Sequence, residues 1–104
     1  MMTDQQILDK IKSVVLEEIP EAKIYLFGSR TSGKIHSESD WDLLVLTEND
    51  LSKNVKKDIE EKLFPLSMAV SSVFSFIITT RKDWNHNPGY YALHLGIGDQ
   101  FITL

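Results

Sequence analysis

The chain has 104 residues, enough for one hydrophobic core but too few for a catalytic domain joined to a separate recognition domain. Hydrophobic residues make up 42% and charged residues 25%, which argues against a disordered or low-complexity chain. The formal charge of -4, without a basic stripe, argues against an extended nucleic-acid surface, and the lack of cysteine excludes disulfides and thiolate metal sites. We therefore expect a single domain over residues 1–104.

The first predicted element is an amphipathic helix. Thr3 and Asp4 are suitable N-cap residues, apolar residues then recur at helical spacing, and Pro20 interrupts the pattern. A short apolar and aromatic run then predicts a strand over residues 23–27, which stops at Gly28.

The second half of the chain predicts two more strands around a second helix. Residues 41–46 form an apolar run, and the polar residues after it can cap a helix that Pro65 is expected to end. Residues 73–80 are rich in β-branched and aromatic side chains and predict a third strand. A turn is expected at residues 87–89, followed by a short helix over residues 91–95 and a tail of undefined form. This order predicts a small α+β domain, with helices packed on a mixed sheet of three or more strands.

Two acids, Asp40 and Asp42, flank Trp41 at the start of the second predicted strand. Because side chains alternate along a strand, both acids lie on one face, with Cα atoms roughly 6.5 to 7 Å apart. A buried carboxylate is costly unless it is paired, hydrogen-bonded or bound to a metal. Hard oxygen ligands placed in this way suit Mg²⁺ or Mn²⁺, which often completes its coordination with water and phosphate.

Gly28 and Ser29 form a predicted turn at the end of the preceding strand. A glycine there leaves backbone N–H groups accessible to phosphate oxygens. Each of these residues alone is also an ordinary turn residue. Their combination with Asp40 and Asp42 favours a site where phosphate and metal meet.

Gly28-Ser29-Arg30, followed by residues 39–43 (SDWDL), resembles the GS-x10-D-x-D signature of the DNA polymerase beta-like nucleotidyltransferase superfamily. The likeness is greatest to its small prokaryotic branch of minimal nucleotidyltransferases, and the order of elements agrees over about residues 5–65. The resemblance implies a polymerase beta palm-like fold.

The resemblance also implies an activity and a site. Gly28 and Ser29 would hold ATP or another nucleoside triphosphate, with Arg30 supporting the triphosphate, while Asp40 and Asp42 would bind the divalent metal, Mg²⁺ or Mn²⁺. A nucleoside monophosphate, most simply AMP from ATP, would pass to a hydroxyl with loss of pyrophosphate.

One part of the family pattern is missing. Active members carry a third carboxylate on the next strand. In this chain the corresponding place is about Val73 to Ser75, and it contains no acid. Losing one ligand of a two-metal site should slow transfer or leave nucleotide binding alone. Two functions therefore stay open: an enzyme with weakened activity, or a non-catalytic module that binds nucleotide or a partner.

The partner and the location follow from the same resemblance and from composition. Stand-alone relatives of this size often occur with a helical HEPN-type protein, and some act as antitoxins that adenylylate this partner. No stretch approaches the ~18 apolar residues of a membrane span, so we expect a cytoplasmic protein without a membrane segment. Trp84, Tyr90 and Tyr91 could stack on a base, but packing against the core is the favoured interpretation.

Overall fold

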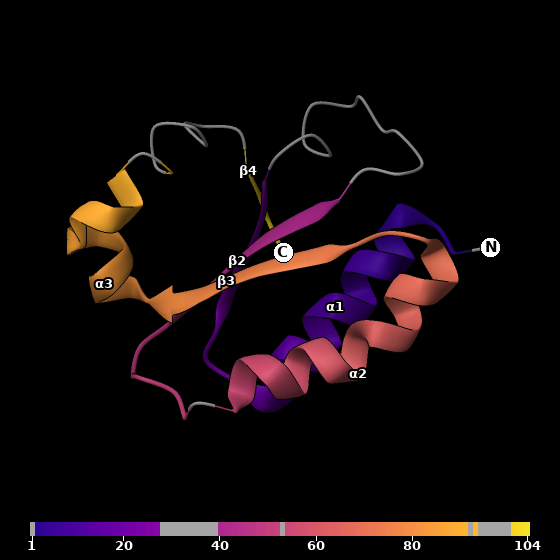
Figure 1. The fold of residues 1–104 in the computed structure, drawn as a ribbon, viewed down its shortest axis with the longest axis horizontal. Helices are drawn as coiled ribbons and strands as arrows, with labels where there is room; N and C mark the ends of the chain where they lie inside the picture. The colour runs from indigo at the N-terminus through magenta and orange to yellow at the C-terminus, as the bar shows by residue number, and fades with distance from the viewer. Residues whose placement is uncertain (1, 28–39, 53, 92, 94–100) are drawn as a thin grey trace.

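The computed structural model describes residues 2–27, 40–52, 54–91, 93 and 101–104. Within them the strands form one four-stranded mixed sheet of order β3-β2-β1-β4, in which β1 pairs antiparallel with β2 and β4, and β2 pairs parallel with β3 (Figure 1). The predicted α+β fold is confirmed. In chain order the elements are α1 (Asp4–Glu18), β1 (Lys23–Phe27), β2 (Trp41–Thr47), α2 (Val55–Val70), β3 (Phe74–Thr80), α3 (Arg81–His86), the 3-10 helix η2 (Pro88–Tyr90) and β4 (Phe101–Thr103).

Helix α1 begins and ends where the sequence predicts. The Thr3 hydroxyl accepts a hydrogen bond from the Gln6 backbone N–H at 3.1 Å, and the Gln6 side chain accepts one from the Thr3 N–H at 2.8 Å. This reciprocal capping box satisfies two backbone donors that the first turn leaves without partners. The helix ends at Glu18, two residues before Pro20, because proline cannot continue the pattern.

Helix α2 contradicts the expectation that Pro65 ends it, because the helix continues to Val70. Pro65 lies on the solvent side, so the carbonyl of Glu61 that it leaves without an N–H donor can be hydrated. Beyond it, Leu66 and Val70 pack against the core and hold the last turn in place. Tertiary packing therefore outweighs the local cost of the proline.

The two faces of the sheet are covered differently. Figure 1 shows α1 and α2 side by side on one face, and the larger core lies there, including Ile11, Leu43 and Ile59. On the other face, Trp84 of α3 packs with Leu44 and Leu46 of β2. This smaller cluster lies over the second half of β2, and Phe27 of β1 packs against it. Among the described helices, none is long and apolar enough to cross a membrane.

Candidate active site

Strand β2 presents the acid pair at its beginning. Trp41 and Leu43 are buried in the core beneath α1 and α2, and alternation places Asp42 on the opposite face. Asp40 precedes the strand and is exposed, while Asp42 is half-buried. The structure therefore holds Asp42 rigidly through buried neighbours while its carboxylate faces away from the main core.

Four strands contribute one residue each to a row that runs through Asp42. The register pairs Asp42 with Ser75 of β3 on one side and with Phe27 of β1 on the other, and Phe27 pairs in turn with Phe101 of β4. Paired residues in neighbouring strands point to the same face of a sheet. A hydroxyl, a carboxylate and two aromatic rings thus lie in order across this face.

The surroundings of Asp42 are unfavourable for a bare carboxylate. Burial raises the pKa of Asp42 above its ordinary value of 3.8, and the nearby negative charge of Asp40 raises it further. Within the described part of the chain, the Asp42 carboxylate has no hydrogen-bond or ion-pair partner. A divalent cation would offset both the burial and the repulsion, and carboxylate oxygens are the ligands that Mg²⁺ and Mn²⁺ prefer.

Ser75 lies at one of the two positions that correspond to the third carboxylate of active family members. It lies directly beside Asp42 on the parallel neighbour β3 and is exposed. Val73, the other candidate position, precedes β3, and its carbonyl accepts a hydrogen bond from the Trp41 N–H at 2.9 Å. In the residues that the structure describes, no three His, Cys, Asp or Glu side chains gather as a ready metal site. The acid pair is thus accompanied by a hydroxyl instead of a third acid.

The other predicted site residues, Gly28, Ser29 and Arg30, fall in residues 28–39 and lie outside the described residues. Phe27, which immediately precedes Gly28 in the sequence, is the direct pairing partner of Asp42. The described end of β1 and the acid pair are therefore neighbours.

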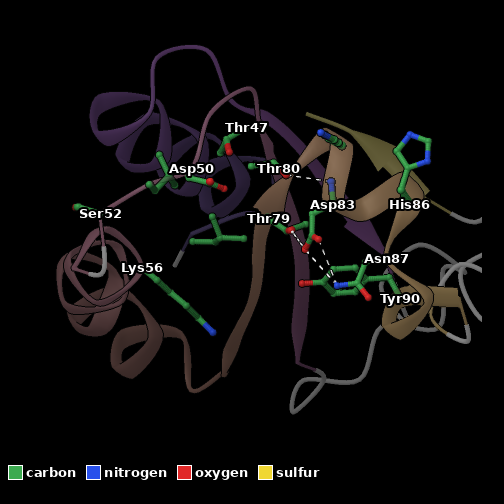
Figure 2. A pocket seen from close by; sticks show the side chains of 13 residues that line it. Thr47, Asp50, Ser52, Lys56, Thr79, Thr80, Asp83, His86, Asn87 and Tyr90 are labelled. Carbon is green, nitrogen blue, oxygen red and sulfur yellow. Dashed lines mark hydrogen bonds between the residues drawn. The ribbon is translucent and has the colours of Figure 1, made fainter.

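A separate pocket of about 680 Å³ lies at the other end of β2 and β3, roughly 17 Å along the strand from Asp42 (Figure 2). Three of its polar residues, Thr79, Asp83 and Asn87, are hydrogen-bonded to one another. The Asp83 carboxylate accepts hydrogen bonds from the Thr79 hydroxyl at 3.1 Å and from the Asn87 amide at 3.3 Å, and the buried Thr47 hydroxyl donates to the Asn49 carbonyl at 2.9 Å. These contacts hold α3 against the sheet end.

The aromatic residues divide between the two ends of the sheet. Trp84 is buried and its ring lies 5.3 Å from that of Tyr90, which confirms the packing interpretation for this pair, whereas Tyr91 is exposed. The aromatic residues beside the acids are Phe27 and Phe101, which sequence reasoning did not single out. Only the pairing of β4 with β1 reveals Phe101, because three residues are too few for a clear strand pattern.

Comparisons with known proteins agree with this fold. The model of the nucleotidyltransferase domain family matches residues 8–84. Spectinomycin 9-adenylyltransferase from Campylobacter jejuni is 34% identical over 50 residues, which are 48% of this chain and only 19% of that relative. The chain thus matches about a fifth of the length of this curated relative.

Solved structures extend the likeness over most of the chain. A toxin-antitoxin complex with AMP-PNP contains a chain that is 25% identical, with a TM-score of 0.64 and coverage of 91% of this chain and 69% of that one. A chain of the MntA-HpeT toxin-antitoxin complex is 26% identical, with a TM-score of 0.63 and coverage of 93% and 70%. The MNT antitoxin complex with a tri-AMPylated Shewanella oneidensis HEPN toxin has a chain 22% identical, with a TM-score of 0.60 and coverage of 97% and 71%, which shows the fold alone.

The sheet, its helices and these structural neighbours define a protein of the nucleotidyltransferase fold. Because the family model spans most of the chain, the protein belongs to the nucleotidyltransferase domain family.

Proposed function

We propose that this protein is a metal-dependent nucleotidyltransferase that moves AMP from ATP to a hydroxyl of a protein partner in the cytoplasm. The observation that carries the proposal is the Asp42 carboxylate: half-buried, next to Asp40, and without a partner among the described residues. Asp40 and Asp42 would hold Mg²⁺ or Mn²⁺. Phe27 supports the rest of the site, because it pairs with Asp42 and is followed directly by the proposed phosphate-binding residues Gly28, Ser29 and Arg30.

The residues of this chain divide the work between them. When bound, the divalent metal neutralises phosphate charge and favours departure of pyrophosphate. Asp42 would fix the position of the site, because Trp41 and Leu43 on either side of it are buried in the core. Gly28 and Ser29 would orient the triphosphate through backbone N–H groups, and Arg30 would contact its oxygens as a charged donor.

Structural neighbours support a protein acceptor. Two of them, at 25% and 26% identity, come from toxin-antitoxin complexes, and one of these contains AMP-PNP. We propose that this chain likewise works with a separate partner and that the partner is a helical protein of the HEPN type, as in the Shewanella oneidensis complex. The partner would bring the acceptor hydroxyl to the face that carries Asp42.

A second function is favoured by one residue. Ser75 stands where a third carboxylate would assist removal of the acceptor proton, and a hydroxyl is a poor base at neutral pH. The alternative is therefore a non-catalytic module that binds the nucleotide or inhibits the partner by contact. Nucleotide binding without transfer would favour this alternative.

Calorimetry with ATP decides the binding part of the proposal. We expect ATP to bind in the presence of Mg²⁺ or Mn²⁺ but not in excess chelator, since two carboxylates repel a bare triphosphate. Asp42→Asn should abolish the metal-dependent binding, while Glu21→Gln, an exposed acid in the turn after α1, should leave it unchanged. Equal binding with chelator, or no binding in either condition, would refute the proposal. Transfer is then measured with α-labelled ATP and the candidate partner protein.

A further inference from the structure

We propose that Phe101 and Phe27 form a stacking platform for the base of the bound nucleotide. This inference rests on the proposed function and adds the position of the base to it. The platform belongs to β4 and β1, so it is separate from the residues proposed to bind phosphate and metal.

The register places the two rings in line with the acid. Phe27 is paired with Asp42, and Phe101 is paired with Phe27, so the row leads from the carboxylate outward over two strands. Neighbouring strands are about 4.8 Å apart, which puts Phe101 about 10 Å from Asp42. An extended nucleotide separates its phosphate from its base by a comparable distance. A phosphate at Asp42 therefore allows the base to lie over the aromatic pair.

Exposure distinguishes Phe101 from the aromatic residues of the core. Its exposed fraction is 46%, whereas Phe27 is half-buried and packs against the smaller cluster around Trp84, so Phe101 supplies the more accessible ring. The Tyr25 ring contacts the Phe101 ring edge to face, with centroids 5.5 Å apart and planes at 85°. This contact supports Phe101 beside β1 and leaves nearly half of the side chain accessible to a ligand.

A base is the occupant that matches both ends of the row. Aromatic faces stack favourably on nucleobases, and every base has a suitable face. An apolar partner side chain would use the rings but would have no relation to the adjacent carboxylate. A nucleotide uses both, because its charged phosphates and its flat base are separated along one molecule.

The test compares ATP with inorganic tripolyphosphate, which carries the same kind of charge but no base, both with Mn²⁺ present. Phe101→Leu keeps an apolar side chain of similar size and removes the aromatic face. We expect this variant to weaken ATP binding about 5- to 100-fold and to leave tripolyphosphate binding unchanged. The matched control is Ile102→Ala, because Ile102 is 44% exposed but lies on the opposite face, paired with Leu26. It should change neither affinity.

Phe101→Trp provides a second readout. Tryptophan keeps the stacking face, so the variant should retain ATP affinity, and its fluorescence should change on addition of ATP but not of tripolyphosphate. Circular dichroism melts of each variant check that β4 remains folded. This variant keeps the proposal testable if Phe101→Leu does not fold.

Several results would overturn the inference. Phe101→Leu could leave ATP affinity within two-fold of the wild type, or could weaken ATP and tripolyphosphate equally. It could also weaken binding of a partner protein while nucleotide affinity stays unchanged, which would make the rings a protein contact. If the wild type binds neither probe, the proposed function itself fails. If it binds both with equal affinity, only the base platform fails.

Discussion

Asp42 and Asp83 lie at opposite ends of the same sheet, and their surroundings differ in kind. Asp83, in the first turn of α3, is exposed and accepts hydrogen bonds from Thr79 and Asn87, while its own backbone N–H donates to the Thr80 hydroxyl at 3.0 Å. Asp42 is half-buried, and no described residue donates to its carboxylate or pairs with it. The more buried of the two acids is thus the less compensated.

This difference supports our proposal that Asp42 is a metal ligand, while Asp83 has a structural role. A carboxylate whose bonds are satisfied within the fold contributes to the fold, as Asp83 does for α3. A half-buried carboxylate without internal compensation lowers the stability of the free protein, which is expected if Asp42 binds a cation as we propose. The pocket of about 680 Å³ lies beside Asp83, whereas the acids that we propose to bind the metal lie at the other end of the sheet.

The largest change in stability should come from Leu43→Ala. This variant removes a buried side chain of β2, the strand that reaches both the Asp42 end and the Asp83 end of the sheet. Leu43 is fully buried on β2 beneath α1 and α2, so its truncation should lower the free energy of unfolding by about 3 kcal/mol. Urea denaturation measures the loss. Leu8→Ala, at a partly buried position on α1, should cost clearly less. Equal losses would mean that β2 is not the rigid centre of the sheet.

Next in size is a gain from Ser75→Asp, which would make the Asp42 end more like an active two-metal site. The new acid would stand beside Asp42 and could take the acceptor proton, a contribution typically of ~10² to 10⁴-fold. We expect AMP transfer to the partner to rise at least ten-fold in an assay with labelled ATP. Val73→Asp is the control, because Val73 precedes β3 and should give little gain. Strong wild-type transfer that Ser75→Asp does not increase would show that the base comes from elsewhere.

Asp83→Ala should give a smaller loss, confined to the other end. The variant loses the hydrogen bonds from Thr79 and Asn87, and since these are exposed, we expect a destabilisation of about 1 kcal/mol. Metal-dependent ATP affinity should stay at the wild-type level. Thermal denaturation and calorimetry measure the two effects. A loss of ATP affinity in a folded Asp83→Ala protein would contradict the division of roles.

The smallest effect is expected for the thermal stability of Asp42→Asn, which should rise slightly where the truncations above lower stability. Because the folded pKa of Asp42 is raised, folding favours the protonated acid, and this stabilisation is present below the ordinary pKa of 3.8 and lost as pH rises through the folded pKa. At neutral pH without metal, Asp42→Asn should therefore melt slightly above the wild type. The difference should vanish near pH 3.5. A clearly lower melting temperature at pH 7 would make Asp42 a structural acid.

Much of the fold was predictable because it follows from local patterns. A capping residue and helical spacing of apolar residues predict α1. Short apolar runs predict β1 and β2, and each of these signals lies within a few residues. The prediction that α2 ends at Pro65 was wrong, because the helix beyond it is stabilised by packing against residues distant in sequence. Helix α3 was missed, although Thr80 followed by Asp83 at cap spacing was a usable signal.

The site was predictable in part for the same reason. Asp40 and Asp42 are two residues apart, so strand alternation alone brings them together. Ser75 could be placed beside them only by assuming that β3 neighbours β2, which the register confirms. Phe101 could not be placed at all, because its pairing with Phe27 joins the two ends of the chain.

The edge strand β4 should separate from the sheet more easily than the central strand β2. It has three residues, all exposed, so few buried contacts hold it against β1. Its amides should exchange with deuterium sooner than those of β2, because β4 can detach while the core remains intact. A ligand that rests on Phe101 then binds only the attached state. Its apparent affinity therefore also measures how often the edge of the sheet is closed.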